Sequence, residues 1–188
     1  MSGSLPTQIV VVTLLSVVVA FCLSAAEAAL LRMSRVRASE LLDDGRVGAR
    51  ALVAVLEQPA PYLAVLAFVR IVAEAATAVL ITVGVTAVTD SLTRALVTAV
   101  AAMAVVSFVV VGVSPRTLGR QHYDRVALMA APVARVLRRV LGPLSHGLVA
   151  LGNAVTPGKG YRDGPFQSES ELRDLLDEAS ERSVIEVQ

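Results

Sequence analysis

Several residue types are scarce in this chain of 188 residues. It contains no tryptophan, and aromatic residues make up only 4%, so valine, alanine and leucine supply the apolar bulk. The single cysteine, Cys22, cannot form an intrachain disulfide, which excludes a disulfide-stapled fold. We expect Cys22 to be a small buried hydrophobic residue. The net charge of +1 gives no indication of nucleic acid, and no nucleic-acid partner is expected.

Hydrophobic residues, by contrast, are abundant. They make up 55% of the chain, and the mean hydropathy is +0.67. Soluble domains rarely reach such values, so the composition indicates an integral membrane protein. Charge is absent from the first part of the chain, because the first charged residue is Glu27 and no lysine or arginine precedes Arg32.

Three apolar segments are predicted to cross the membrane as helices, at residues 7–31, 61–89 and 95–115. Each has about the 20 residues or more that a helix needs to cross the hydrocarbon core. A cleaved signal peptide is the alternative for the first segment. Signal peptides begin with positive charge, however, and this N-terminus has none.

The arginines that follow these segments predict the orientation of the chain. One group follows the first segment and another follows the third, namely Arg32, Arg35 and Arg37, and Arg116, Arg120 and Arg125. Arginines beside a membrane helix favour the cytoplasmic side. We therefore expect a multi-pass protein of the bacterial cytoplasmic membrane, with its N-terminus outside and its C-terminus in the cytoplasm.

The segments between and after the predicted spans are more polar. Residues 35–57 predict two short juxtamembrane helices, with Gly45 and Gly48 as the break between them. Residues 154–167 are rich in glycine and proline and predict a linker. Residues 168–188 predict an acidic helix, whose apolar stripe requires a partner.

The segment at residues 126–151 is amphipathic. Its apolar residues recur at spacings of three and four, and Arg135, Arg138 and Arg139 lie off that stripe. This pattern is typical of a helix that lies in the membrane interface with its arginines toward lipid phosphates. A fourth spanning helix is the alternative, although arginines midway through a span would be costly. The predicted fold class is an all-α integral membrane protein with three transmembrane helices, short juxtamembrane helices, an interfacial amphipathic helix and a C-terminal acidic helix.

Arg70 and Glu74 are unusual because they lie four residues apart inside the second apolar segment. An unpaired charge is costly in a low dielectric, so each of them needs a partner. One interpretation places Arg70 in a pocket inside the membrane, paired with Glu74 or with Glu27 of the first segment. The other places Arg70 near the inner interface, extended toward headgroups, with Glu74 as its i,i+4 partner. No nucleophile signature and no phosphate-binding glycine loop occurs, so we do not expect an enzyme.

Three local patterns occur in order along the chain. They are LSAAEAALLRMSRVRASEL at residues 23–41, LEQPAPYLAVL at 56–66 and GVSPRTLGRQHYDRVALMAAPV at 112–133. In this order and spacing they resemble the membrane domain of the CorC/CorB/CNNM family of magnesium transporters. The resemblance implies that residues 1–153 form a CNNM-type transmembrane domain, and that the acidic helix leads into a CBS pair absent from these residues. It also implies membrane lipid and a second copy as partners, in a homodimer or in a heterodimer with a paralogue.

The intramembrane magnesium site of the family draws on oxygens from three stretches. These are an S-A-S-E segment, a G-N-N-x-x-N stretch in the second helix and a G-E-x-T-P-K-T turn that ends the third. By this resemblance Ser24 and Glu27 match the first serine and the glutamate of the S-A-S-E segment, whereas Ala26 replaces its second serine. Arg70 and Glu74 stand at the first and last of the asparagine positions.

The third stretch departs further from the family pattern. Gly112 stands at the glutamate position of the turn, while Ser114 keeps a hydroxyl at the threonine position. Pro115 is expected to break the third helix and free backbone carbonyls, which would either coordinate an ion or simply mark the end of the helix. The metal-site residues implied are Ser24, Glu27, Glu74, Gly112 and Ser114, with Arg70 paired inside the same pocket.

The resemblance implies a protein of magnesium transport or homeostasis, working in the export direction with sodium as a coupling ion. Because several oxygen ligands are missing, the alternative is a transport-incompetent regulatory or scaffold paralogue with a degenerate ion site. Glu27 would either neutralise the cation or pair with an arginine. Small residues at 73–78 and 99–104 permit close helix approach, at a dimer seam or within one subunit.

Overall fold

The computed structural model of the chain describes residues 4–155, which contain helices and no strand within that range. The chain comprises two compact units, residues 1–145 and 146–188, and the first unit contains the structure discussed below. The predicted acidic helix at 168–188 lies outside the described residues, as does all of the predicted linker except its first two residues. Those two residues belong to the last helix.

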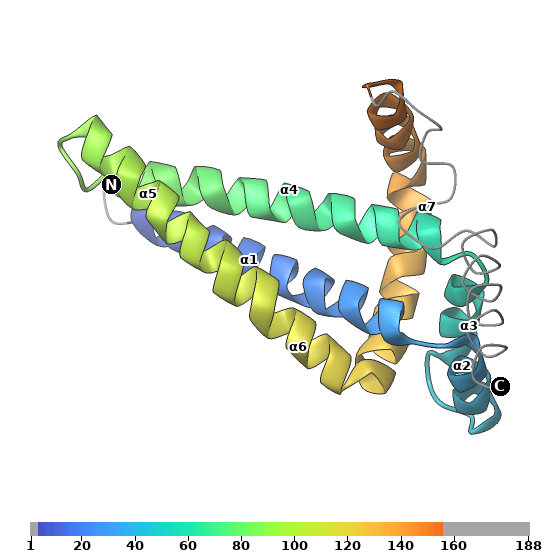
Figure 1. The fold of residues 1–188 in the computed structure, drawn as a ribbon. Coiled ribbons are helices and arrows are strands. Elements are labelled where there is room, and N and C mark those ends of the chain that lie inside the picture. The colour runs from blue at the N-terminus through green and yellow to red at the C-terminus, as the bar shows by residue number, and fades with distance from the viewer. Residues whose placement is uncertain (1–3, 156–188) are drawn as a thin grey trace, which may run out of the picture. The chain divides into compact units, whose positions relative to one another are not determined.

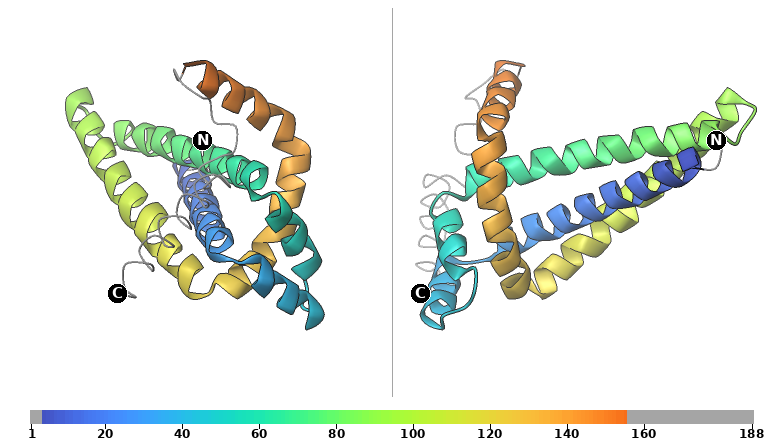
Figure 2. Two further views of the ribbon diagram at one scale, coloured as in Figure 1. Left: turned by 45° about the vertical axis from the view of Figure 1, so that its right-hand side comes forward. Right: turned by 180° about the vertical axis from the view of Figure 1, so that it is seen from behind.

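Three long apolar helices run side by side in alternating directions (Figure 1 and Figure 2). They are α1 (Ser4–Arg32), α4 (Pro59–Thr86), and a continuous helix made of α5 (Leu92–Val105), the π-helical segment η1 (Val106–Val113) and α6 (Ser114–Gln121). Within the described part of the chain, these are the helices that are long and apolar enough to cross a membrane, over Thr7–Arg32, Pro59–Thr86 and Leu92–Gln121. The all-α membrane class and its three spans are thereby confirmed.

The third span does not break at Pro115 as the sequence suggested. The helix continues through η1, where the amide of Ser114 donates a hydrogen bond to the carbonyl of Val109, five residues back. Pro115 then occupies the first turn of α6, a position that its fixed φ suits. A π-helical segment thus absorbs the proline without ending the helix.

Two short helices follow α1 at its arginine-rich end. The hydroxyl of Ser34 accepts a hydrogen bond of 3.1 Å from the amide of Arg37 and caps α2 (Arg35–Asp43). The chain then turns through two glycines with positive φ, Gly45 at 68° and Gly48 at 87°, into α3 (Ala49–Glu57). The predicted break between two juxtamembrane helices is therefore confirmed.

Gly48→Ala is expected to destabilise the protein by about 2 kcal/mol, because a Cβ at this φ is strained. That Cβ would also overlap the backbone carbonyl of Leu128 in the last helix, α7 (Tyr123–Val155). Gly45→Ala is the matched control, since Gly45 also has positive φ but has open space where its Cβ would lie. Thermal unfolding followed by circular dichroism should show the larger loss for Gly48→Ala. Equal losses would contradict the close contact with α7.

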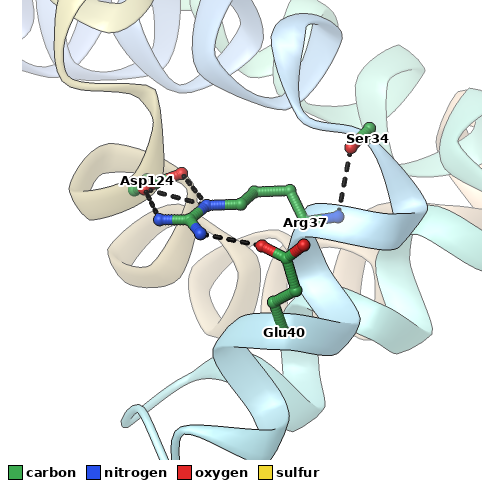
Figure 3. A network of polar contacts seen from close by, with 4 residues as sticks. All are labelled: Ser34, Arg37, Glu40 and Asp124. Atoms are coloured by element: carbon green, nitrogen blue, oxygen red, sulfur yellow. Dashed lines mark hydrogen bonds and ion pairs between the residues drawn. The ribbon is translucent and has the colours of Figure 1, made fainter.

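The last helix, α7 (Tyr123–Val155), is held to α2 by the charge network drawn in Figure 3. Arg37 donates from Nη2 to Oδ2 of Asp124 at 2.8 Å and from Nε to the same carboxylate at 3.2 Å. Its Nη1 also donates to Glu40 at 2.8 Å. The hydrogen bonds to Asp124, and then those to Glu40, raise the pKa of Arg37 above its ordinary value, so it stays charged. This contact fixes the start of α7 beside the end of the first span.

The core of residues 1–145 lies at this arginine-rich end of the bundle. Its fully buried large side chains include Leu52, Val55, Val65 and Leu66, from α3 and the first half of α4. Toward the other end, the spans are less buried, and the third span has only 11% of its most apolar stretch buried. The exposed side chains there are apolar, as lipid or another subunit requires.

Cys22 is exposed on α1, contrary to the expectation that it would be buried. It still lies in the middle of an apolar span, so its hydrophobic character fits a surface that faces lipid.

Candidate ion site between the spans

Helices α1 and α4 bring the charged residues of the bundle together. On α1, Ser24 and Glu27 lie three residues apart and therefore share a face. On α4, Arg70 and Glu74 lie four residues apart and share a face as well. The two helices pack closely, and four small residues on this part of α1 are buried in the bundle, namely Ala25, Ala26, Ala28 and Ala29. The two pairs consequently meet within one bundle.

Arg70 binds both glutamates. Its Nε donates to Oε1 and Oε2 of Glu27 at 3.1 and 3.3 Å, and its Nη1 donates to Oε1 of Glu74. The side chains of Arg70 and Glu27 are only 18% and 17% exposed, and that of Glu74 is 24% exposed. The guanidinium therefore lies between one carboxylate on each helix, as a cation tethered to α4.

The charge balance of this triad explains why it is tolerated. Two carboxylates share one guanidinium, which leaves the group with a net charge of −1 instead of −2. Removing one partner from such a group leaves a charge unpaired in a low dielectric, which is costly. The three side chains of the triad therefore depend on one another across α1 and α4.

A small apolar cluster closes the bundle next to these charges. Ala20 of α1, Ala73 of α4 and Val111 of η1 are buried against one another, and Val106 packs on them. Ala73 directly precedes Glu74, so the cluster adjoins the triad along α4. On α4 the triad is therefore adjoined directly by packed apolar side chains of all three spans.

Buried hydroxyls accompany the charged groups. Ser24 is only 2% exposed, and Thr77 is only 1% exposed. The Thr77 hydroxyl donates to the carbonyl of Ala73 at 2.8 Å. Sequence reasoning overlooked Thr77, although it lies seven residues after Arg70 and three after Glu74, on the same helix face. That spacing was the signal by which it could have been found.

Gly112 and Ser114, also implied by the sequence, lie in a different setting. Gly112 lines a cavity of about 560 Å³ together with Ser107, Arg116, Thr117 and Arg120, and among residues 4–155 no acidic side chain lines it. A Cβ on Gly112 would come within 3.0 Å of the carbonyl of Ser107, so this position favours glycine. Ser114 is exposed at the start of α6. A metal-binding role for either residue stays a prediction.

Chemically, the arrangement can hold one cation between two carboxylates, and Arg70 supplies that cation here. Magnesium requires near-octahedral oxygen coordination, and a guanidinium offers no acceptor. Within residues 4–155, no group of three histidine, cysteine or acidic side chains is placed to hold a metal ion. A metal at this position would therefore need Arg70 to move, with hydroxyls, carbonyls or water completing its coordination.

Comparison with known proteins agrees with this architecture. A family model described as the Cyclin M transmembrane N-terminal domain, CNNM, matches residues 10–188. Two curated relatives, UPF0053 protein Mb2387c of Mycobacterium bovis and UPF0053 protein Rv2366c of Mycobacterium tuberculosis, are each 40% identical over 162 residues, or 86% of this chain. The matched region is 37% of the length of each relative. The chain thus belongs to the CNNM family of multi-pass membrane proteins, a family associated with divalent-cation transport.

Proposed function

We propose that this chain forms the membrane domain of a magnesium transporter that exports the ion from the cytoplasm, with no enzymatic step. The observation that carries the proposal is the Glu27–Arg70–Glu74 triad, because it places two carboxylates from different spans around one cation inside the bundle. Family membership supplies the ion class. The arginine-flanked ends of the spans support a cytoplasmic C-terminus in the cell membrane.

In this proposal Arg70 holds the site while no ion is bound. Exchange of its single charge for the double charge of magnesium would change the net charge of the group from −1 to 0, which favours the incoming ion electrostatically. Ser24 on α1 and Thr77 on α4 would supply buried hydroxyl oxygens. Sodium is the proposed coupling ion, because a monovalent cation could replace magnesium between the same carboxylates during return.

Glu74→Gln is expected to lower magnesium flux by about tenfold or more, because loss of a charged partner for a desolvated cation costs at least about 1.4 kcal/mol. Flux would be measured in liposomes that contain the full-length protein. Asp90→Asn is the matched control, since Asp90 is exposed in the connection between the second and third spans. Flux from the native protein that equals that of empty vesicles would contradict the transport proposal.

A second function is favoured by one specific observation. Arg70 already binds both carboxylates, so the site is filled by the chain itself. A transport-incompetent regulatory or scaffold subunit, paired with a second copy or with a paralogue, would show this arrangement. Calorimetric titration of the native protein with magnesium distinguishes a transporter from a transport-incompetent subunit, because only the transporter should bind the ion.

A further inference from the structure

A second cavity carries positive charge and lies away from the triad. It has a volume of about 570 Å³ and is lined by Tyr62, Pro132, Arg135, Val136, Arg138 and Arg139. No acidic side chain lines it, and none of its arginines belongs to an ion pair in the part of the chain that the structure describes. Three neighbouring cations without counter-charges repel one another, so this cavity is suited to an anion.

The arginines are arranged to bind a phosphate group. The guanidinium of Arg138 lies over the ring of Tyr62, 4.5 Å from its centroid, which holds it in place and leaves the N–H groups at its edge available. Arg135 and Arg139 are one helical turn apart on α7 and flank Arg138. Guanidinium groups bind phosphate oxygens in pairs and with charge-assisted hydrogen bonds.

The surroundings of the cavity indicate that this phosphate belongs to a lipid. One face of α7 carries a stripe of apolar residues, each of which is more than half exposed. They are Met129, Val133, Val136, Val140 and Leu144. Val136 belongs both to this stripe and to the cavity wall, so an anionic group and an apolar chain would be bound side by side. Tyr62 is in the first turn of a membrane span, at the depth where lipid headgroups lie.

The size of the cavity agrees with this chemistry. Sites for small molecules occupy about 300–1,000 Å³, and this cavity falls within that range. An isolated inorganic phosphate would fill only a small part of it. We propose that Tyr62, Arg135, Arg138 and Arg139 form a specific binding site for the phosphate headgroup of an anionic phospholipid.

The test compares lipid retention by the full chain in detergent, measured by native mass spectrometry with phosphatidylglycerol and phosphatidylcholine. The native protein should retain phosphatidylglycerol in preference to phosphatidylcholine. The variant with Arg135→Gln, Arg138→Gln and Arg139→Gln should lose about tenfold or more of that affinity, as expected for loss of charge-assisted hydrogen bonds. Circular dichroism of the variant would verify that it remains folded.

A charge-matched variant controls for general attraction of the lipid to a basic protein. It carries Arg46→Gln, Arg50→Gln and Arg94→Gln, all at exposed positions away from the cavity, and it should retain phosphatidylglycerol as the native protein does. Equal loss in both variants would overturn the site. Tyr62→Phe should retain the lipid and Tyr62→Leu should weaken it, because the ring supports Arg138.

Two further measurements distinguish the lipid from other possible occupants of the cavity. Inorganic phosphate in large excess should leave the lipid bound, and complete displacement by it would assign the cavity to soluble phosphates. Glu171→Gln with Glu178→Gln should not change lipid retention. Increased retention in that variant would identify the acidic segment of the chain as the occupant and overturn the lipid proposal.

Discussion

Arg70→Asn is expected to destabilise the protein and to make its stability depend on magnesium. The substitution leaves Glu27 and Glu74 facing one another without the guanidinium that binds both. Removing one partner of a buried ion pair costs about 3–5 kcal/mol, or roughly 6–20 °C in Tm for a chain of this size. Magnesium at 100 times its Kd should restore about 2.7 kcal/mol of that loss. Because the chain lacks tryptophan, unfolding would be followed by circular dichroism in detergent.

The control for this experiment removes all three charges. The variant with Glu27→Gln, Arg70→Asn and Glu74→Gln leaves no charge unpaired, so it should be nearly as stable as the native protein and should not respond to magnesium. An Arg70→Asn variant that is as stable as the native protein, with or without magnesium, would mean that the triad does not hold the spans together.

Gly119→Val is expected to separate α6 from α1. A Cβ at Gly119 would overlap the backbone carbonyl of Ala25 and approach the Cβ of Ala28 to 3.1 Å. Backbone atoms in two packed helices cannot yield as a flexible side chain can, so the helices must move apart. Overpacking of this kind costs about 3 kcal/mol or more, which corresponds to roughly 6–12 °C in Tm. Gly119→Ala should produce a smaller loss in the same direction.

Gly84→Ala provides the matched comparison. Gly84 lies in the helical interior of α4, and its Cβ would meet only the side chain of Ile9, at 3.9 Å. Alanine there should be neutral or stabilising by up to about 1 kcal/mol, because glycine lowers helix stability. If Gly119→Ala also stabilised the protein, the close approach of α6 to α1 would be refuted.

Much of the topology could be predicted from local patterns. The three apolar segments, the glycine break after α2 and the amphipathic α7 each follow from residues that are neighbours in sequence, because helix periodicity and hydrophobic length are local properties. The placement of the 126–151 segment in the membrane interface stays a prediction. Family membership was likewise predicted from three short motifs and is confirmed.

The candidate site was only partly accessible in this way. The sequence identified Arg70, Glu74 and Glu27 as intramembrane charges, but it left two interpretations of Arg70 open. The choice of Glu27 as a partner depends on the packing of α1 against α4, across 43 positions of sequence. The π-helical accommodation of Pro115 was missed because a proline pattern predicts a helix end unless neighbouring turns can adjust their hydrogen bonds.

The sequence by itself determined that this chain crosses a membrane, how many spans it has and which charges those spans must accommodate. Length and hydrophobicity act within each segment, so no knowledge of neighbouring segments was needed. Only the tertiary structure decided which charges meet and that Tyr62 lies under Arg138. Such contacts depend on how helices rotate and approach when small residues let their backbones come close, and this information is distributed over the whole bundle.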